Sequence, residues 1–596
     1  MKKILMAAAT ITLLMTTAVL TACTSDNDDN PVSGSDSRIV GRWCSDVSGK
    51  TYAKWNYGET WQLTEFKADG TGSTRIYYTA NDKAVAVEAI DFTYTASADG
   101  QLTMTPKDRD VMTAHWQLAG EELRLDNGDN ISLTFKKPTA DMAAKLDQWS
   151  KDDMIPVPQP SKFTVFVYGN AGGTMDIAIE EGFWEKAKAF LTDHNNVRVV
   201  CFYKYGRDKV DQQGNHSFTG KYAEPGDIVW FELNSETDLD KIKEEGFQAM
   251  GFSDQAIALK LCDPDALKMF IEFSSIVCPA EQYVFSIWGH GSGFNPMTDF
   301  PGKYSMDTPA TRGVIYDEWN NNEELDMYEL HDAIKATGID RLNTLFFHNC
   351  MMGNLETLTT VTDCADYICC SAHVLRSCGE VLTEFVRGLY DKGSAEEAAA
   401  QMFERITPVW QNEYKEDGPT VNGDYKMYRT DRFQGILNAA KHLADRLIQL
   451  YPTQQEAIDR ATKQVYRYDP LKAEYSCPFF DIADYAHLLA QETGDAEFAA
   501  ISDEMDDAFK TAFVHYRDVN WSQQHLDHYT LSVCLVNQRY YTAGYKSVNP
   551  TFWPNDFYEG YEQCDFHRLT GWGNWLRMNQ QPLDSNPQSG GGGALQ

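Results

Sequence analysis

Two patterns of apolar residues divide the chain. Between residues 38 and 137, apolar and polar residues alternate over short stretches separated by Gly-containing turns, as in WQLTEFKADGTGSTRIYYT and DFTYTASADGQLTMT. Alternation with a period of two predicts strands with one buried face, and regular short strands with tight turns are typical of a small β barrel or sandwich. From residue 162 onward the apolar runs become nearly continuous.

Continuous apolar runs, most of them separated by helical segments, predict an α/β domain over residues 162–393. Strands buried on both faces are typical of parallel sheets. Their alternation with helices predicts a three-layer α/β/α sandwich with a mostly parallel sheet. The runs are Phe163–Tyr168, Val197–Tyr203, Ile228–Leu233, Tyr283–Trp288 and Leu342–Phe347.

Helical patterns dominate after residue 393. Ser394 and Glu397 form a capping box that predicts a helix start, and residues 528–537 predict one further strand. We expect residues 394–578 to be a mainly helical extension that packs on the α/β domain. Residues 138–161, which end in a proline-rich stretch, are expected to be a linker, and residues 579–596 a disordered tail.

The first residues predict export and a lipid anchor. A short cationic start and an apolar stretch end in Leu20-Thr21-Ala22-Cys23, which resembles the lipobox of bacterial lipoproteins. Residues 1–22 are therefore expected to be a signal peptide and Cys23 the lipidated first residue of the mature protein. An acidic spacer follows at 23–37 and is expected to be disordered. This start predicts an outer-membrane lipoprotein. The acidic residues behind Cys23 resemble those that accompany display on the outer surface in some Gram-negative lipoproteins.

Charge and cysteine spacing exclude some classes of partner and site. The net charge is −35 and the pI about 4.7, so nucleic acid would be repelled. No two of the 13 cysteines form a CxxC pair, which argues against a zinc ribbon. With Gly41-Arg42-Trp43 at its start, the region 38–137 resembles the small lipocalin-like domains of bacterial lipoproteins. A generic β module that acts as a stalk remains the alternative to ligand binding.

Candidate catalytic residues follow two of the predicted strands. The run ending at Trp288 continues into Gly289-His290-Gly291, and the run ending at Phe347 continues into His348-Asn349-Cys350. Groups just past the carboxyl ends of neighbouring strands line one crevice of an open α/β sheet. A nearby imidazole can act as the base of a thiol nucleophile, and a glycine beside it lets an amide approach a substrate oxygen.

The blocks WGHGSGF, RGVIYDE, LDMYELHDAI, LNTLFFHNCMMGNLETL and CADYICCSAHVL resemble those of the clostripain-like cysteine peptidases. These peptidases share the fold of caspases, gingipains and legumains. The resemblance implies that His290 is the general base and Cys350 the nucleophile of a His/Cys dyad. It also implies that the amides of Gly291 and Cys350 hold the oxyanion. The implied reaction is hydrolysis of peptide bonds through a thioester.

One position departs from the family pattern, which has Asp two residues before the nucleophile where this chain has His348. On an extended strand these two positions face the same side, so His348 is expected to line the specificity pocket. His373, Arg376 and Glu380 are expected near the same crevice. A histidine does not supply the negative charge that favours Arg or Lys before the scissile bond. We therefore expect neutral or acidic residues there. The alternative is that His348 only forms local hydrogen bonds and that another acidic residue lines the pocket.

The remaining implications concern processing, cofactors and partners. Family members are often cut between the catalytic His and Cys, and Lys303 or Arg312 lies in a suitable loop. Calcium dependence occurs in the family, but no EF-hand-like loop is found, so neither a cofactor nor a metal is expected. The expected partners are protein or peptide substrates, for a protein expected to be a monomer.

Two other functions stay open from the sequence. The substitution at His348 fits a catalytically silent, peptidase-like binding lipoprotein, although the presence of His290 and Cys350 argues against it. His290, His348 and Cys350 could also be three ligands of a zinc hydrolase.

Overall fold

The structure is a computed structural model, and every statement below concerns the part of the chain that it describes. The described residues are 36–46, 59–80, 83–107, 111–126, 132–149, 159–170, 175–210, 214, 216–247, 260–291, 293, 314–320, 323–373, 375, 379–417, 422–466, 468, 479–520, 530–535 and 561–579.

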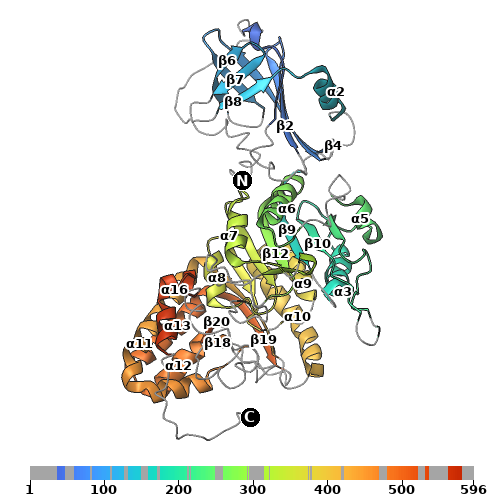
Figure 1. Ribbon diagram of the computed structural model, residues 1–596. Helices are drawn as coiled ribbons and strands as arrows, with labels where there is room; N and C mark the ends of the chain where they lie inside the picture. The colour runs from blue at the N-terminus through green and yellow to red at the C-terminus, as the bar shows by residue number, and fades with distance from the viewer. Residues whose placement is uncertain are drawn as a thin grey trace.

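The alternating region forms a closed antiparallel barrel of eight strands, seen in blue in Figure 1. Strands that follow one another in sequence pair, and β1 closes the barrel by pairing with β8 through Cys44 and Lys136. The apolar face of each strand fills the interior, where Trp43, Phe66 and Trp116 are buried. The expected β module is therefore confirmed. Its strands are β1 (Gly41–Asp46), β2 (Glu59–Phe66), β3 (Thr71–Ala80), β4 (Lys83–Ala96), β5 (Gln101–Pro106), β6 (Met112–Ala119), β7 (Glu122–Asp126) and β8 (Ser132–Lys136).

The segment expected to be a linker contains a helix that packs on the outside of the barrel. In α2 (Ala140–Trp149), Leu146 and Trp149 are buried against Tyr77. Arg42 and Asp147 form an ion pair of 2.8 Å across the same contact. The apolar positions of this short helix thus cover outward-facing apolar residues of the barrel, which the alternation alone left without a partner.

The α/β part is built on a mixed sheet of eight strands in the order β11-β10-β9-β12-β15-β16-β17-β19. The central strands β10, β9, β12, β15 and β16 are mutually parallel, whereas β11, β17 and β19 are antiparallel to their neighbours. The mostly parallel sheet is confirmed, and β11 is the antiparallel exception among the strands that the sequence predicted. The bounds are β9 (Ser161–Asn170), β10 (Val197–Lys204), β11 (Ile228–Leu233), β12 (Ala280–Trp288), β15 (Leu342–His348), β16 (Ala365–Cys370), β17 (Asn422–Arg429) and β19 (Phe513–Asn520).

Helices cover both faces of this sheet and create two large apolar cores. One core contains side chains of α6 (Pro264–Val277), α7 (Met327–Lys335), α8 (Leu355–Val361), α11 (Phe433–Gln464), α12 (Ile482–Thr493), α13 (Ala496–Ala512), α16 (Asp565–Thr570) and α17 (Trp572–Met578). The other contains side chains of α3 (Met175–Ile179), the π-helical turn Glu180–Trp184, α4 (Glu185–Lys188), α5 (Ile242–Glu245), α9 (Glu380–Lys392) and α10 (Ala395–Asp417).

The C-terminal region does more than add helices. Its strands β17 and β19 extend the central sheet beyond β16, and β18 (Phe479–Asp481) pairs with β20 (Ser532–Cys534). These strands were not expected, apart from β20 inside the run 528–537. Figure 1 shows α11, α12, α13 and α16 gathered at one side of the sheet. The C-terminal region is thus built into the α/β unit.

Among the described helices, none is both long and apolar enough to cross a membrane.

Candidate active site

The two candidate catalytic loops leave the sheet side by side. Strands β12 and β15 pair in parallel, and their register places Trp288 opposite His348. The Gly289 amide donates to the His348 carbonyl oxygen at 3.4 Å, which extends the pairing past the strand ends. His290 and Cys350 therefore lie two residues beyond a matched pair of positions, at the carboxyl end of the sheet where such sites form.

Glycines let the two loops make main-chain contact. A Cβ atom on Gly291 would lie 2.7 Å from the Cys350 carbonyl oxygen and 3.2 Å from the Cys350 nitrogen, so a side chain does not fit there. Gly293 has a φ of +58° and packs in the same way against the Met351 carbonyl oxygen. The loop that carries His290 is thereby held directly against the loop that carries Cys350.

The turn after Cys350 has an unusual backbone conformation. Met351 has a φ of +58°, in the left-handed region that costs a residue with a side chain roughly 1–2 kcal/mol. Two hydrogen bonds of 2.9 Å hold it: the Met351 amide donates to the His373 carbonyl, and Asn354 Nδ2 donates to the Met351 carbonyl. This turn takes Cys350 off the strand and leads into α8, whose N-cap is Asn354.

A main-chain amide contacts the thiol itself. The Leu375 N–H donates to Cys350 Sγ at 3.2 Å, and the sulfur lies 3.6 Å from the Leu375 carbonyl oxygen. The main chain of Leu375 thus offers the sulfur both a donor and an acceptor, which fixes the position of the Cys350 side chain. His290 is exposed and Cys350 half-buried, which suits a base and a nucleophile that must meet a substrate.

His348 does not lie where the sequence placed it. Its side chain is 2% exposed and stacks on Trp288 with ring centroids 3.9 Å apart, while Nδ1 lies 3.1 Å from the Tyr425 hydroxyl. Burial lowers its pKa to about 3, against the opposing effect of the Glu380 carboxylate. The expected alternation fails because the strand ends at His348 and the chain turns before Cys350. His348 is a neutral core residue beneath the site.

The other residues expected in the specificity pocket have partners in different parts of the chain. His373 is 2% exposed; its Nε2 lies 3.1 Å from the Tyr466 hydroxyl, so its imidazole faces the C-terminal region. Glu380 opens α9, is 27% exposed in its side chain and pairs with Lys186. The expected Cys23, Lys303, Arg312 and Arg376 lie outside the described residues.

A buried polar network, which the sequence analysis missed, supports the segment that contacts Met351. Asp424 of β17 accepts hydrogen bonds from Ser371 Oγ (2.6 Å) and from the amides of Ala372 (3.1 Å) and His373 (3.0 Å). Its ion-pair partner is Lys426, 2.8 Å away, and both side chains are at most 1% exposed. Because Asp424 and Lys426 are charged, β17 contains no continuous apolar run, and so no sequence signal indicated a buried strand there.

A candidate metal site lies away from the two candidate catalytic loops. Among the described residues, His331, Asp363 and Cys364 form a cluster with metal-ligand atoms. Asp363 already pairs there with Lys335 at 3.2 Å, which opposes a cation. This cluster precedes β16 and so lies at the amino end of the sheet.

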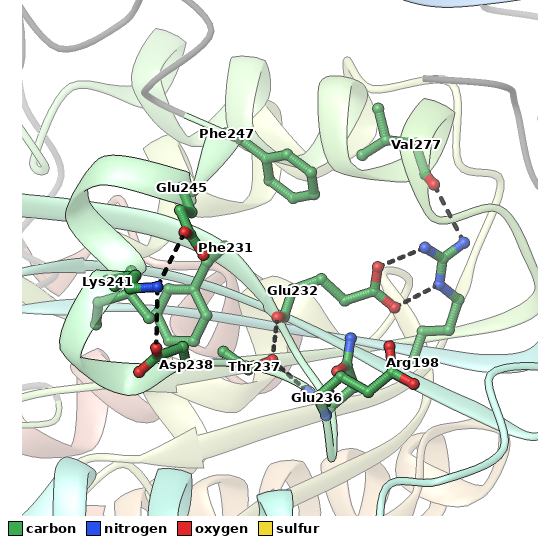
Figure 2. A pocket seen from close by; sticks show the side chains of 13 residues that line it. Arg198, Phe231, Glu232, Glu236, Thr237, Asp238, Lys241, Glu245, Phe247 and Val277 are labelled. Carbon is green, nitrogen blue, oxygen red and sulfur yellow. Dashed lines mark hydrogen bonds and ion pairs between the residues drawn. The ribbon is translucent and has the colours of Figure 1, made fainter. Parts of the chain in front are cut away.

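A cavity of about 400 Å³ lies near the start of β10 (Figure 2). The Arg198 guanidinium binds the Glu232 carboxylate in a bidentate pair of 2.8 and 2.6 Å, and also donates to the Val277 carbonyl. Arg198 pairs in register with Thr164, near the amino end of β9, whereas His290 follows the carboxyl end of β12. The cavity is therefore separate from the catalytic loops.

Comparison with solved structures gives several similar proteins. A secreted cysteine protease from Bacteroides thetaiotaomicron, in complex with an irreversible peptide inhibitor, is 13% identical with a TM-score of 0.44 over 70% of this chain and 100% of that one. An inactive zymogen protease from Parabacteroides distasonis is 13% identical with a TM-score of 0.44 over 70% and 99%. A B. fragilis cysteine protease is 19% identical with a TM-score of 0.29 over 42% and 96%.

No curated protein matches the chain. The model of the clostripain family of peptidases matches residues 179–565, which is more than half of the 596 residues. The match includes both candidate catalytic loops and the C-terminal strands that extend the sheet. The chain therefore belongs to the clostripain family of cysteine peptidases.

Proposed function

We propose that this protein is a cysteine endopeptidase of the caspase-like fold, with His290 as general base and Cys350 as nucleophile. The observation that carries the proposal is the contact between their two loops at Gly291. The parallel register of β12 and β15 supports the same assignment, since it sets both residues at one edge of the sheet.

In the proposed reaction, His290 accepts the proton of the Cys350 thiol, and the sulfur attacks the carbonyl carbon of the scissile peptide bond. The imidazolium returns that proton to the leaving amine as the C–N bond breaks, which leaves a thioester on Cys350. Water, deprotonated by His290, then attacks the thioester and releases the carboxylic acid and the thiol. The amides of Gly291 and Cys350 hold the oxyanion of each tetrahedral intermediate.

For specificity, we propose that the enzyme does not prefer Arg or Lys before the scissile bond. His348 stands where the family pattern has Asp, and its side chain is buried on Trp288 beneath the site, so this position supplies no negative charge to the pocket. Glu380, the acidic group expected in the pocket, pairs with Lys186, which offsets part of its charge. Neutral or acidic side chains at this substrate position are then accepted at least as well as basic ones.

The proposed location is the outer membrane, with the mature protein anchored through a lipidated Cys23. The acidic spacer would then connect the anchor to the barrel, and the barrel would act as a stalk for the peptidase domain. The filled barrel interior supports a stalk. Metabolic labelling with a fatty-acid analogue, compared between native protein and Cys23→Ala, tests the anchor.

The test of activity combines an alkylating active-site probe with a mixed peptide library. Native protein should cleave peptides and become alkylated at Cys350. His290→Ala and Cys350→Ala should each lose cleavage by at least about 100-fold, the typical contribution of a positioned base or nucleophile. The cut sites report specificity directly, and a clear excess of cuts after Arg or Lys would refute the specificity proposal. Failure of native protein to cleave, even after limited proteolysis, would favour the silent binding lipoprotein.

A further inference from the structure

Asn349, the residue immediately before the nucleophile, makes two hydrogen bonds to main-chain carbonyls. Its side-chain nitrogen donates to the His290 carbonyl oxygen at 3.0 Å and to the Val314 carbonyl oxygen at 2.9 Å. Both neighbours are acceptors, so the amide must present its nitrogen to them. Asn349 is 1% exposed, and both of its amide hydrogens are used inside the protein.

These bonds join three separate parts of the chain. His290 lies on the loop after β12, and Asn349 lies on the loop after β15. Val314 begins the hairpin of β13 (Ile315–Asp317) and β14 (Glu323–Leu325), and its own amide donates to the Leu325 carbonyl at 2.8 Å. One side chain therefore ties the loop of the base and this hairpin to the loop of the nucleophile.

The hairpin itself is firmly attached to the sheet. Asp317 is fully buried and forms an ion pair of 2.9 Å with Lys204 of β10, which is 1% exposed. The Asp317 carboxylate also accepts the amides of Leu261 at 2.9 Å and Trp319 at 3.0 Å. Because Val314 is three residues from this anchor, its carbonyl is a fixed point from which Asn349 positions the neighbouring loop.

The identity of Asn349 follows from its donors. Its Oδ1 is buried without a hydrogen-bond partner among the described residues, a condition that costs about 1–3 kcal/mol. An apolar residue would avoid this cost but would leave the carbonyls of His290 and Val314 without their donor. Space is also restricted, since a Cβ on Gly291 would lie 2.7 Å from the Asn349 Cβ.

We propose that Asn349 is a positioning residue that holds the His290 loop at the distance from Cys350 required for proton transfer. The inference rests on the proposed function and deepens it. The Asn349 side chain is buried and uses both amide hydrogens inside the protein, so it acts through the His290 main chain. A displacement of about 1 Å in such a pair reduces turnover roughly 100-fold, so this is the expected loss in kcat when both hydrogen bonds are removed.

The experiment compares Asn349→Ala and Asn349→Asp with native full-length protein. The aspartate keeps the size of the side chain but removes the donors. The matched control is Asn196→Ala, because Asn196 Nδ2 also donates to a main-chain carbonyl, that of Tyr390 at 2.6 Å, at the other end of the sheet. Circular dichroism establishes that each variant is folded.

Three readouts are measured on each protein: kcat and KM with the best library peptide, the pH profile of Cys350 alkylation by iodoacetamide, and hydrogen exchange of the segments 289–291 and 314–320. Both Asn349 variants should lose kcat about 100-fold with KM within about threefold. Their alkylation profiles should shift to higher pH, because an imidazole held farther from the sulfur stabilises the thiolate less. Exchange should rise in both segments. Asn196→Ala should match native protein in all three.

The outcomes separate this inference from the proposed function. Native protein that cleaves peptides while both Asn349 variants keep its kcat and alkylation profile overturns the positioning role alone. Faster exchange without a change in the alkylation profile also overturns it, because the side chain would then be only structural. Native protein that neither cleaves nor reacts faster than an ordinary thiol overturns the proposed function, and the positioning role with it.

Discussion

The buried ion pair between Asp424 and Lys426 is expected to support both the fold and the nucleophile turn. Asp424 accepts the donors of residues 371–373, and the His373 carbonyl in turn accepts the Met351 amide. Lys426 Nζ also donates to the Tyr468 hydroxyl at 3.0 Å. We therefore consider Lys426→Met, Asp424→Asn and the double variant.

The expected magnitude follows from burial. Each side chain is at most 1% exposed, and removing one partner of a buried pair typically costs 3–5 kcal/mol, because the remaining charge is left uncompensated. The double variant removes both charges. Its loss of unfolding free energy should therefore be smaller, by roughly 1–3 kcal/mol, than the sum of the losses in the two single variants. A domain is commonly stable by about 5–15 kcal/mol, so each single variant remains foldable but much weakened.

The assay is urea unfolding followed by far-ultraviolet circular dichroism. Most described helices belong to the α/β part of the chain and the barrel is built of strands, so the helical signal reports the domain that contains the pair. Double-mutant analysis of the unfolding free energies gives the coupling. Peptide cleavage by Asp424→Asn should fall as well, since the donors of Ser371 and His373 then lose their charged acceptor.

The pH dependence supplies a second check. Burial raises the pKa of Asp424. Lys426 and the other partners lower it by more than burial raises it, so the pKa lies below the usual value. The stability from this group is therefore present above the unfolded pKa of about 3.9 and is lost as pH falls through the folded pKa. This account of the pair would be refuted if the losses of unfolding free energy in the two single variants added up to that of the double variant. It would also be refuted if Asp424→Asn lost stability at low pH as native protein does.

Two further predictions concern residues beside the dyad. His348 has a pKa of about 3 in the fold against about 6.5 when unfolded, so the unfolded state binds more protons between these values and stability falls with decreasing pH by up to about 1.4 kcal/mol per unit. In His348→Phe, the unfolding free energy measured by urea titration should lack this pH dependence between the two pKa values. An unchanged dependence on pH would contradict the burial argument. Gly291→Ala should lower kcat roughly 100-fold by separating the loops. The control is Gly435→Ala, where a Cβ would lie 3.5 Å from the Ala508 Cβ, and it should keep native activity. Equal kcat in the two variants would show that the close contact at Gly291 is not required.

The strands that lead into the two candidate loops were predictable because their signals are local. His290 and Cys350 each follow an apolar run that forms a strand within a few residues of the expected bounds. Asn349 carried no such signal, since nothing in HNC indicates which carbonyls its amide reaches. His348 was misplaced because the strand ends at that residue, and strand ends are set by the following turn at Met351.

The C-terminal strands were missed for a related reason. In β17, Asp424 and Lys426 are fully buried, although such residues are almost never buried unless paired. A strand containing both looks solvent-exposed when only the sequence is known. Their pairing with each other and with Tyr468, 42 residues beyond Lys426, is what makes their burial possible.

The sequence by itself determined the alternating strands of the barrel, the continuous strands of the central sheet, and the two loops that carry the proposed base and nucleophile. These features depend on the periodicity and residue types of short segments. Only the tertiary structure decided that β12 and β15 are neighbours, that His348 is buried and neutral, and that Asn349 joins the catalytic loops. Strand order, burial and hydrogen-bond partners arise from contacts between residues distant in the chain, and no local pattern specifies them.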